Sequence, residues 1–243
     1  MECLSEVEIG PCRNSRFLRP LRLHYTQNGV RKEWDFMKTH DSVSVLIYHP
    51  MRDSFVLVKQ FRPAFKLIDV FPLAVYACEC ARQGILPMAD AVSMDADPQA
   101  RVPVQPLPAS AGITYELCAG IVDKPGLSLE ETAKEEIQEE CGYRVPLESL
   151  QKITSYRSGV GLTGANHTMF YVEVSDDMHM GTDGGKPEEG ELIEVVHLPR
   201  KDWQTFVLDE CIPKTAGVNF AFMWFQECIA SRPQASKYLL SSS

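Results

Sequence analysis

The sequence predicts an α+β fold in which a mixed β-sheet is combined with a few helices. Runs rich in Val, Leu and Ile at residues 43–48 and 55–61 have the length and composition of strands. Residues 129–141 form an acidic segment with helical periodicity. A second helix is expected at residues 214–230, where the apolar and aromatic composition suits a core or a dimer interface. Further strands are expected at residues 113–119, 152–156, 168–174 and 193–198.

The first 42 residues predict a separate β-hairpin. Residues 21–25 alternate between apolar and polar side chains, and an Asn28-Gly29 pair follows before a second strand-like run at 30–36. We therefore divide the 243 residues into an N-terminal β subdomain, residues 1–42, and a main domain, residues 43–243.

Residues 64–110 interrupt this pattern of strands and helices. They contain little clean periodicity, and several prolines punctuate their second half. A structureless loop of this length is uncommon inside a compact domain. We interpret it as an irregular insertion in the main domain.

Charge and cysteine content exclude several classes of partner. The formal net charge of −9 argues against a nucleic-acid surface, because phosphate backbones attract Lys and Arg. No run approaches the roughly 18 apolar residues of a membrane helix. The N-terminus lacks a secretory pattern, so the eight cysteines are expected to be reduced thiols in the cytoplasm.

The acidic segment carries clear signals for where its helix begins and ends. Ser128 followed by Glu131 forms a capping box, in which each residue bonds the backbone N–H of the other. Gly142 supplies the left-handed conformation that commonly ends a helix.

Three carboxylates of this helix fall on one arc. With about 100° between successive side chains, Glu136, Glu139 and Glu140 lie beside the apolar stripe, whereas Glu131 and Glu135 point more toward solvent. Like charges four residues apart cost about 0.2–0.5 kcal/mol per pair. Oxygen ligands suit Mg²⁺, with Mn²⁺ as a substitute, and both ions bridge phosphates. The pattern therefore predicts a magnesium site, and the alternative is a solvated acidic face.

Residues 119–143 resemble the signature box of the Nudix hydrolases. Two positions depart from the box: its Arg is Glu135 here, and its early Glu is missing, with Leu127 near that place. Those groups would orient the loop and the helix. The positions that match are Gly120, Glu136, Ile137, Glu139, Glu140, Gly142 and Tyr143.

The rest of the chain is similar to the ADP-ribose and UDP-sugar pyrophosphatase branch of that family. The likeness extends to the segments 59–62, 115–120 and 189–191. It implies a Nudix α/β/α sandwich with a mixed sheet. It also implies a homodimer that exchanges or packs its N-terminal strands.

The resemblance also implies roles for individual residues. The metal would be bound by the carbonyl of Ala119 and by Glu136, Glu139, Glu140 and Glu191, and the catalytic residues would be Glu139, Glu140 and Glu191. Arg62 would hold a phosphate, or form a surface ion pair. Trp34 would stack on a base in the partner's site. For Glu116, substrate contact and a structural role at the strand end stay open.

The activity implied is magnesium-dependent hydrolysis of the pyrophosphate bond of UDP-sugars, with UDP-glucose giving UMP and glucose 1-phosphate. The substrate would be a small nucleotide sugar, and no nucleic acid or membrane is expected as a partner. One alternative is an ADP-ribose pyrophosphatase. Another is a catalytically silent Nudix module that binds nucleotides.

Overall fold

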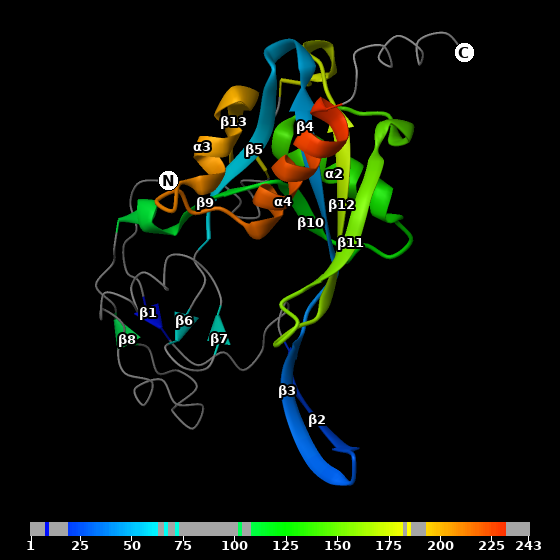
Figure 1. Cartoon of the computed structure of the whole chain (residues 1–243), viewed down its shortest axis with the longest axis vertical. Coiled ribbons are helices and arrows are strands. Elements are labelled where there is room, and N and C mark those ends of the chain that lie inside the picture. Colours follow the sequence, from blue (N-terminus) through cyan, green and yellow to red (C-terminus); the bar gives the residue numbers. More distant parts are fainter. Residues whose placement is uncertain are drawn as a thin grey trace.

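A mixed sheet of seven strands forms the centre of the computed structural model (Figure 1). Its strands are β4 (Ser42–His49), β5 (Ser54–Phe61), β9 (Ile113–Glu116), β10 (Cys118–Ile121), β11 (Gln151–Ser158), β12 (Ala165–Glu173) and β13 (Ile193–Pro199). The main path through the sheet runs β11-β12-β4-β5-β13, while β10 also pairs with β4 and β9 with β5. β12 and β4 are parallel, and the other pairs are antiparallel.

The structure describes residues 19–62, 108–181, 184–185 and 193–231, together with four two-residue strands elsewhere. These short strands are β1 (Glu8–Ile9), β6 (Lys66–Leu67), β7 (Phe71–Pro72) and β8 (Val102–Pro103). They form two small sheets, β1 with β8 and β6 with β7. The predicted insertion at 64–110 falls almost entirely outside the described residues, so that interpretation stays a prediction.

Helices cover both faces of the central sheet. They are α2 (Leu129–Cys141), α3 (Trp203–Leu208) and α4 (Ala216–Phe225), the last continuing as a π-helical turn at Gln226–Ala230. α2 lies on one face, and α3 and α4 lie on the other (Figure 1). Among the described residues, no helix combines the length and the apolar character needed to cross a membrane.

Strand β4 explains how the two apolar cores form. Val43, Val45 and Ile47 belong to the core that includes α2, whereas Leu46 and Tyr48 belong to the core that includes α4. Successive side chains of a strand point to opposite faces. A strand with apolar residues at nearly every position is therefore covered on both sides. The predicted α/β/α sandwich with a mixed sheet is confirmed.

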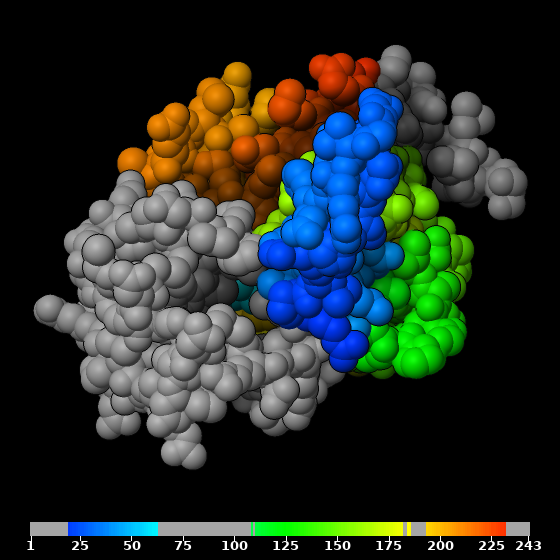
Figure 2. Space-filling model, turned by 90° about the horizontal axis from the view of Figure 1, so that it is seen from below, coloured from blue at the N-terminus to red at the C-terminus, as the bar shows by residue number. Residues whose placement is uncertain are grey.

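The predicted hairpin is present as a separate two-stranded sheet that projects from the body (Figures 1 and 2). It consists of β2 (Arg19–Gln27) and β3 (Val30–Lys38). Both turn residues have positive φ, 53° at Asn28 and 77° at Gly29. That is the backbone of a tight hairpin turn, whose twist matches that of the flanking strands. The backbone N–H of Met37 donates to the carbonyl of Leu162 at 2.8 Å and ties the hairpin to the loop before β12.

The prediction of a single strand at residues 113–119 is wrong. The apolar run 113–119 forms two strands, because the chain changes partner at Leu117: β9 pairs with β5, and β10 pairs with β4. The predicted helix at 214–230 begins at residue 216 and becomes π-helical from residue 226. The remaining predicted strands lie within a few residues of those observed.

Candidate active site

The acidic helix α2 begins and ends where its sequence predicts. The Ser128 hydroxyl accepts the backbone N–H of Glu131 at 3.1 Å, and the Glu131 carboxylate accepts the N–H of Ser128 at 2.7 Å. Gly142 ends the helix with φ of 71°. Ala133 and Ile137 are fully buried. This fixed rotation turns the carboxylate arc toward the edge where β10 crosses α2.

Glu140 is the most unusual of the helix carboxylates. Only 6% of its surface is exposed, and its Oε2 accepts the backbone N–H of Ala119 at 2.9 Å. Burial, together with the negative charge of Glu136, raises the pKa of Glu140 to about 8, although the Ala119 N–H and the charge of Arg62 oppose the rise. Near neutral pH, a bound cation would stabilise the ionised form of Glu140.

Glu136 lies directly against the backbone of Gly120. A Cβ at position 120 would lie 2.0 Å from Oε1 of Glu136, closer than any real contact. Only glycine leaves room for the carboxylate at this place. Glu136 and Glu140 therefore converge on the Ala119–Gly120 segment of β10, as the residue pattern predicts for a shared site.

Glu139 and Glu135 lie on the more exposed side of α2, next to a lysine from the preceding loop. Lys124 Nζ is 2.5 Å from Glu135 Oε2 and 4.0 Å from Glu139 Oε1. Glu139 is the less exposed of the two carboxylates. Its exposure is intermediate between that of Glu135 and that of the buried Glu140.

Arg62 and Glu116 contact each other, which the residue pattern does not anticipate. Nε and Nη2 of Arg62 donate to the two carboxylate oxygens of Glu116 at 2.9 and 2.8 Å. Burial alone would raise the pKa of Glu116, but Arg62 and the Thr114 hydroxyl, 2.6 Å away, together lower it. Glu116 is buried and Arg62 is half-exposed, so this is not an ordinary surface ion pair. Glu116 holds the guanidinium in place, and Thr114 is a member of this group that sequence reasoning missed.

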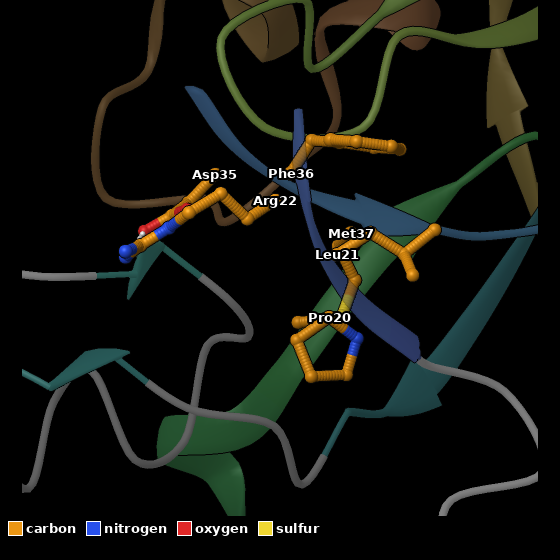
Figure 3. Close-up of a pocket in the computed structure, with 6 residues that line it drawn as sticks. All are labelled: Pro20, Leu21, Arg22, Asp35, Phe36 and Met37. Atoms are coloured by element: carbon orange, nitrogen blue, oxygen red, sulfur yellow. Dashed lines mark hydrogen bonds and ion pairs between the residues drawn. The ribbon is translucent and has the colours of Figure 1, made fainter. Parts of the chain in front are cut away.

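Trp34 lies on the projecting hairpin, half-exposed, while the carboxylates lie on α2 in the body. Near it, the ion-paired side chains of Arg22 and Asp35 form one wall of a pocket on the hairpin (Figure 3). Figure 3 labels the lining residues as Pro20, Leu21, Arg22, Asp35, Phe36 and Met37. Glu191, the remaining predicted site residue, lies outside the described residues.

The side chains present suit a hard divalent cation, although they do not form a complete cage. Within the described part of the chain, no three His, Cys, Asp or Glu side chains are grouped closely enough to hold a metal ion. Glu136 and Glu140 offer oxygen donors beside a backbone segment, and burial of Glu140 favours a bound cation. Mg²⁺ is commonly held by one or two carboxylates, with water and substrate phosphates completing its shell. The donor set fits that mode of binding.

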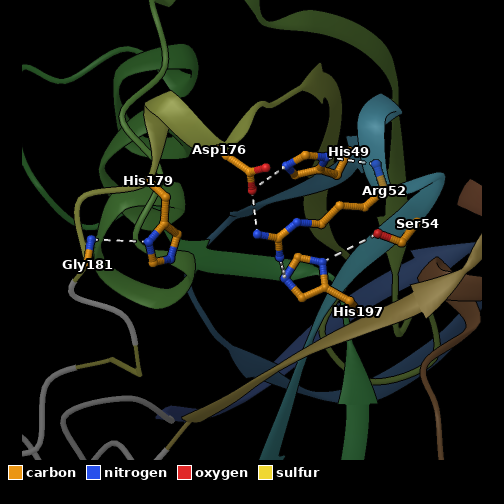
Figure 4. A network of polar contacts seen from close by, with 7 residues as sticks. All are labelled: His49, Arg52, Ser54, Asp176, His179, Gly181 and His197. Atoms are coloured by element: carbon orange, nitrogen blue, oxygen red, sulfur yellow. Dashed lines mark hydrogen bonds and ion pairs between the residues drawn. The ribbon is translucent and has the colours of Figure 1, made fainter.

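A second polar cluster lies at the other end of β4 (Figure 4). His49 is fully buried, and its Nε2 lies 3.2 Å from Asp176 Oδ1. Arg52 also donates to Asp176 and reaches His197, which contacts the Ser54 hydroxyl. Burial first, then the charge of Arg52, lowers the pKa of His197. The histidines carry no spacing in the sequence that would have identified this cluster.

Comparison with known proteins identifies the family. The chain is 53% identical to the uridine diphosphate glucose pyrophosphatase NUDT14 of Bos taurus over 95% of its own length and 97% of that protein. It is 52% identical to the Mus musculus protein of the same name over 93% and 95% of the two lengths. The chain belongs to the Nudix hydrolase family. No family model matches the chain.

A solved structure described as an ADP compounds hydrolase shares the fold. It superimposes with a TM-score of 0.55 over 91% of this chain and 90% of its own, at 16% sequence identity. At that identity the likeness extends to the fold alone. For this Nudix hydrolase it agrees with the mixed sheet and the α/β/α layers described above.

Proposed function

We propose that this Nudix hydrolase cleaves the pyrophosphate bond of UDP-glucose, releasing UMP and glucose 1-phosphate. The convergence of Glu136 and the buried Glu140 on Ala119–Gly120 is the structural observation that carries the proposal. The names of the two relatives, which match this chain over nearly its whole length, support the choice of UDP-glucose.

Magnesium is the metal that we propose for the site. Glu136, Glu140 and the Ala119 carbonyl would hold it, with Glu139 and Glu191 completing the set of ligands. When bound, the metal supplies charge neutralisation for the diphosphate and lowers the pKa of a coordinated water.

The protein residues have distinct tasks in this proposal. Arg62, fixed by Glu116, would donate to a phosphate oxygen and orient the diphosphate. Glu139 or Glu191 would accept the proton of the attacking water. Glu140, buried and hydrogen-bonded to the backbone, would keep its position through the reaction.

We also propose a homodimer assembled through the N-terminal subdomain, residues 1–42. A two-stranded sheet is marginally stable alone, and this hairpin, drawn in blue in Figure 2, exposes large apolar side chains. They include Leu21, Leu23, Val30 and Trp34. A second copy covering them would bring Trp34 toward the partner's nucleotide. Light scattering of the wild type and of Trp34→Ala measures the assembly, and a monomeric wild type would overturn the proposal.

A cytoplasmic location is proposed from cysteine chemistry. Cys118 and Cys141 are free and buried in the core beside α2. Reduced thiols of this kind are typical of the cytosol.

A substrate panel tests the proposed activity. The full-length protein is incubated with UDP-glucose, ADP-ribose and other nucleotide sugars, with magnesium or with EDTA, and UMP or AMP is measured. We expect UDP-glucose to have the highest kcat/KM, and EDTA to abolish turnover. Preference for ADP-ribose by more than about tenfold, or 1.4 kcal/mol, would replace the proposed substrate. Absence of turnover on every member of the panel would leave a silent nucleotide-binding module.

A further inference from the structure

Helix α2 carries more negative charge than its own residues offset. Glu135 and Glu139 lie four residues apart, where like charges destabilise a helix. Lys134 influences Glu131 at the start of the helix. The cation at the Glu135–Glu139 pair comes from outside the helix: Lys124 Nζ lies 2.5 Å from Glu135 and 4.0 Å from Glu139.

Lys124 belongs to the short loop that joins β10 to α2. Both ends of this loop are held by backbone contacts. Val122 N–H donates to the carbonyl of Asp41 at 2.8 Å, and Ser128 caps the helix. Between them the chain turns, with Gly126 at φ of 91° and Leu127 N–H 3.5 Å from the Lys124 carbonyl. The side chain of Lys124 ties the middle of this loop to the second turn of the helix.

We propose that Lys124 is a positioning residue for the metal site. Its ion pair with Glu135 fixes the β10–α2 loop against the helix, and its approach to Glu139 holds that carboxylate on the loop side of α2. Glu135 stands at the place of the box's Arg, and Lys124 lies in the same loop as Leu127, near the place of the missing Glu, so the charges are exchanged relative to that Arg and Glu. The inference rests on the proposed function, because Lys124 acts through a ligand of the proposed metal.

A positioning role and a purely electrostatic role of Lys124 predict opposite effects of one substitution on metal affinity. Lys124→Glu replaces a positive charge by a negative one beside the carboxylate arc. If Lys124 acted only through its field, the more negative site would bind a divalent cation more tightly. If Lys124 positions the loop and Glu139, like-charge repulsion from Glu135 would push the loop away and weaken binding.

The experiment is a charge-exchange cycle measured by metal binding. Binding of Mn²⁺ to the full-length protein is followed by the loss of the free-ion electron paramagnetic resonance signal, and turnover of UDP-glucose is measured in parallel. The variants are Lys124→Glu, Glu135→Lys, their double exchange and the conservative Lys124→Arg. Lys201→Glu makes the same charge change on the exposed segment before α3 and is the matched control.

We expect Lys124→Glu and Glu135→Lys each to weaken Mn²⁺ binding about fivefold, the size of a half-exposed ion pair. The double exchange and Lys124→Arg should bind within about twofold of wild type, and Lys201→Glu should be unchanged. Tighter binding by Lys124→Glu, or strictly additive effects in the double variant, would overturn the positioning role. Failure of wild type itself to bind Mn²⁺ or to turn over UDP-glucose would instead reject the proposed function.

Discussion

The two ends of strand β4 both carry buried ionisable groups, but they are satisfied in different ways. At one end, His49 is fully buried and contacts Asp176, which also accepts from Arg52. At the other end, Ala119 of β10 pairs with Ser44 of β4 and donates its N–H to the buried Glu140 of α2. There, burial raises the carboxyl pKa to about 8.

This difference separates a polar cluster whose charges are paired within the fold from the proposed metal site. Around His49, cationic and anionic side chains from three segments of the chain meet and offset one another. Around Glu140, the charge with the largest effect on its pKa is that of another carboxylate, Glu136, and the opposing charge of Arg62 has a smaller effect. Groups whose pKa is strongly shifted by burial and like charge are typical of functional sites. Substitutions at the two ends of β4 should therefore have different effects on turnover and on stability.

The largest effect on turnover is expected from the α2 carboxylates, near the end of β4 that pairs with β10. Glu139→Gln and Glu140→Gln should each lower turnover at least about a hundredfold, or 2.7 kcal/mol of barrier, because each removes a charge that would bind the metal. Magnesium-dependent release of UMP is the measurement, and circular dichroism checks that the variants are folded. Near-normal rates in both variants would show that the two ends of β4 do not differ in function.

The buried carboxyl of Glu140 should also make the stability of the metal-free protein depend on pH. A carboxyl whose folded pKa is raised from 4.5 to about 8 stabilises the fold fully below pH 4.5, and this stabilisation is lost as pH rises through 8. Between pH 5.5 and 7.5, the unfolding free energy of metal-free wild type should thus fall by about 2 kcal/mol relative to that of Glu140→Gln.

The difference between wild type and variant is the quantity to measure, by chemical unfolding in EDTA. Burial lowers the pKa of His167 and of His197, so those groups shift stability in the opposite direction at acid pH in both proteins. Excess magnesium should remove most of the difference, because it binds the ionised carboxylate. Parallel pH profiles of the unfolding free energy for the two metal-free proteins would show that Glu140 behaves as an ordinary helix carboxylate.

A third change tests the close approach of helix and strand. Gly120→Ala should lower turnover about tenfold, because a misplacement of this size commonly costs one to two powers of ten. The new Cβ would lie 2.0 Å from Glu136 Oε1, so the carboxylate must move. Gly217→Ala is the matched control, since its Cβ would meet only ordinary contacts of 3.6 Å or more. Equal rates in the two variants would mean that the position of Glu136 is unimportant.

Local features of the active site were predictable from the sequence, whereas contacts between distant segments were not. The capping pair Ser128 and Glu131 and the arc of Glu136 and Glu140 follow from helix geometry alone, and the structure confirms them. The strand patterns predict six strands for the main domain, and the sheet has seven because the change of partner at Leu117 divides one of them. An apolar run carries no signal for which neighbouring strand it meets.

Pairings across the sheet depend on register, which the sequence pattern leaves open. For Arg62 and Glu116 the sequence leaves a substrate contact and a structural role both open, and it does not indicate that they meet each other across 54 positions. Lys124 and Glu135 meet across 11 positions because the β10–α2 loop folds back on the helix. His49 and Asp176, 127 positions apart, had no pattern at all. The chemistry of the helix was therefore predictable, and the partners that hold it in place were not.

The smallest effect is expected from Arg52→Ala, at the histidine end of β4. Its side chain and that of Asp176 are at least half-exposed, so loss of the pair should lower the unfolding free energy only slightly. Turnover of UDP-glucose should stay within about twofold of wild type, because the carboxylates at the other end keep their contacts. The positive charge of Arg52 helps to lower the pKa of His197, so that pKa should rise in the variant, as followed by a proton NMR titration of the imidazole. A tenfold loss of turnover with this pKa change would show that the two ends are coupled through β4, and the histidine cluster would then belong to the catalytic machinery.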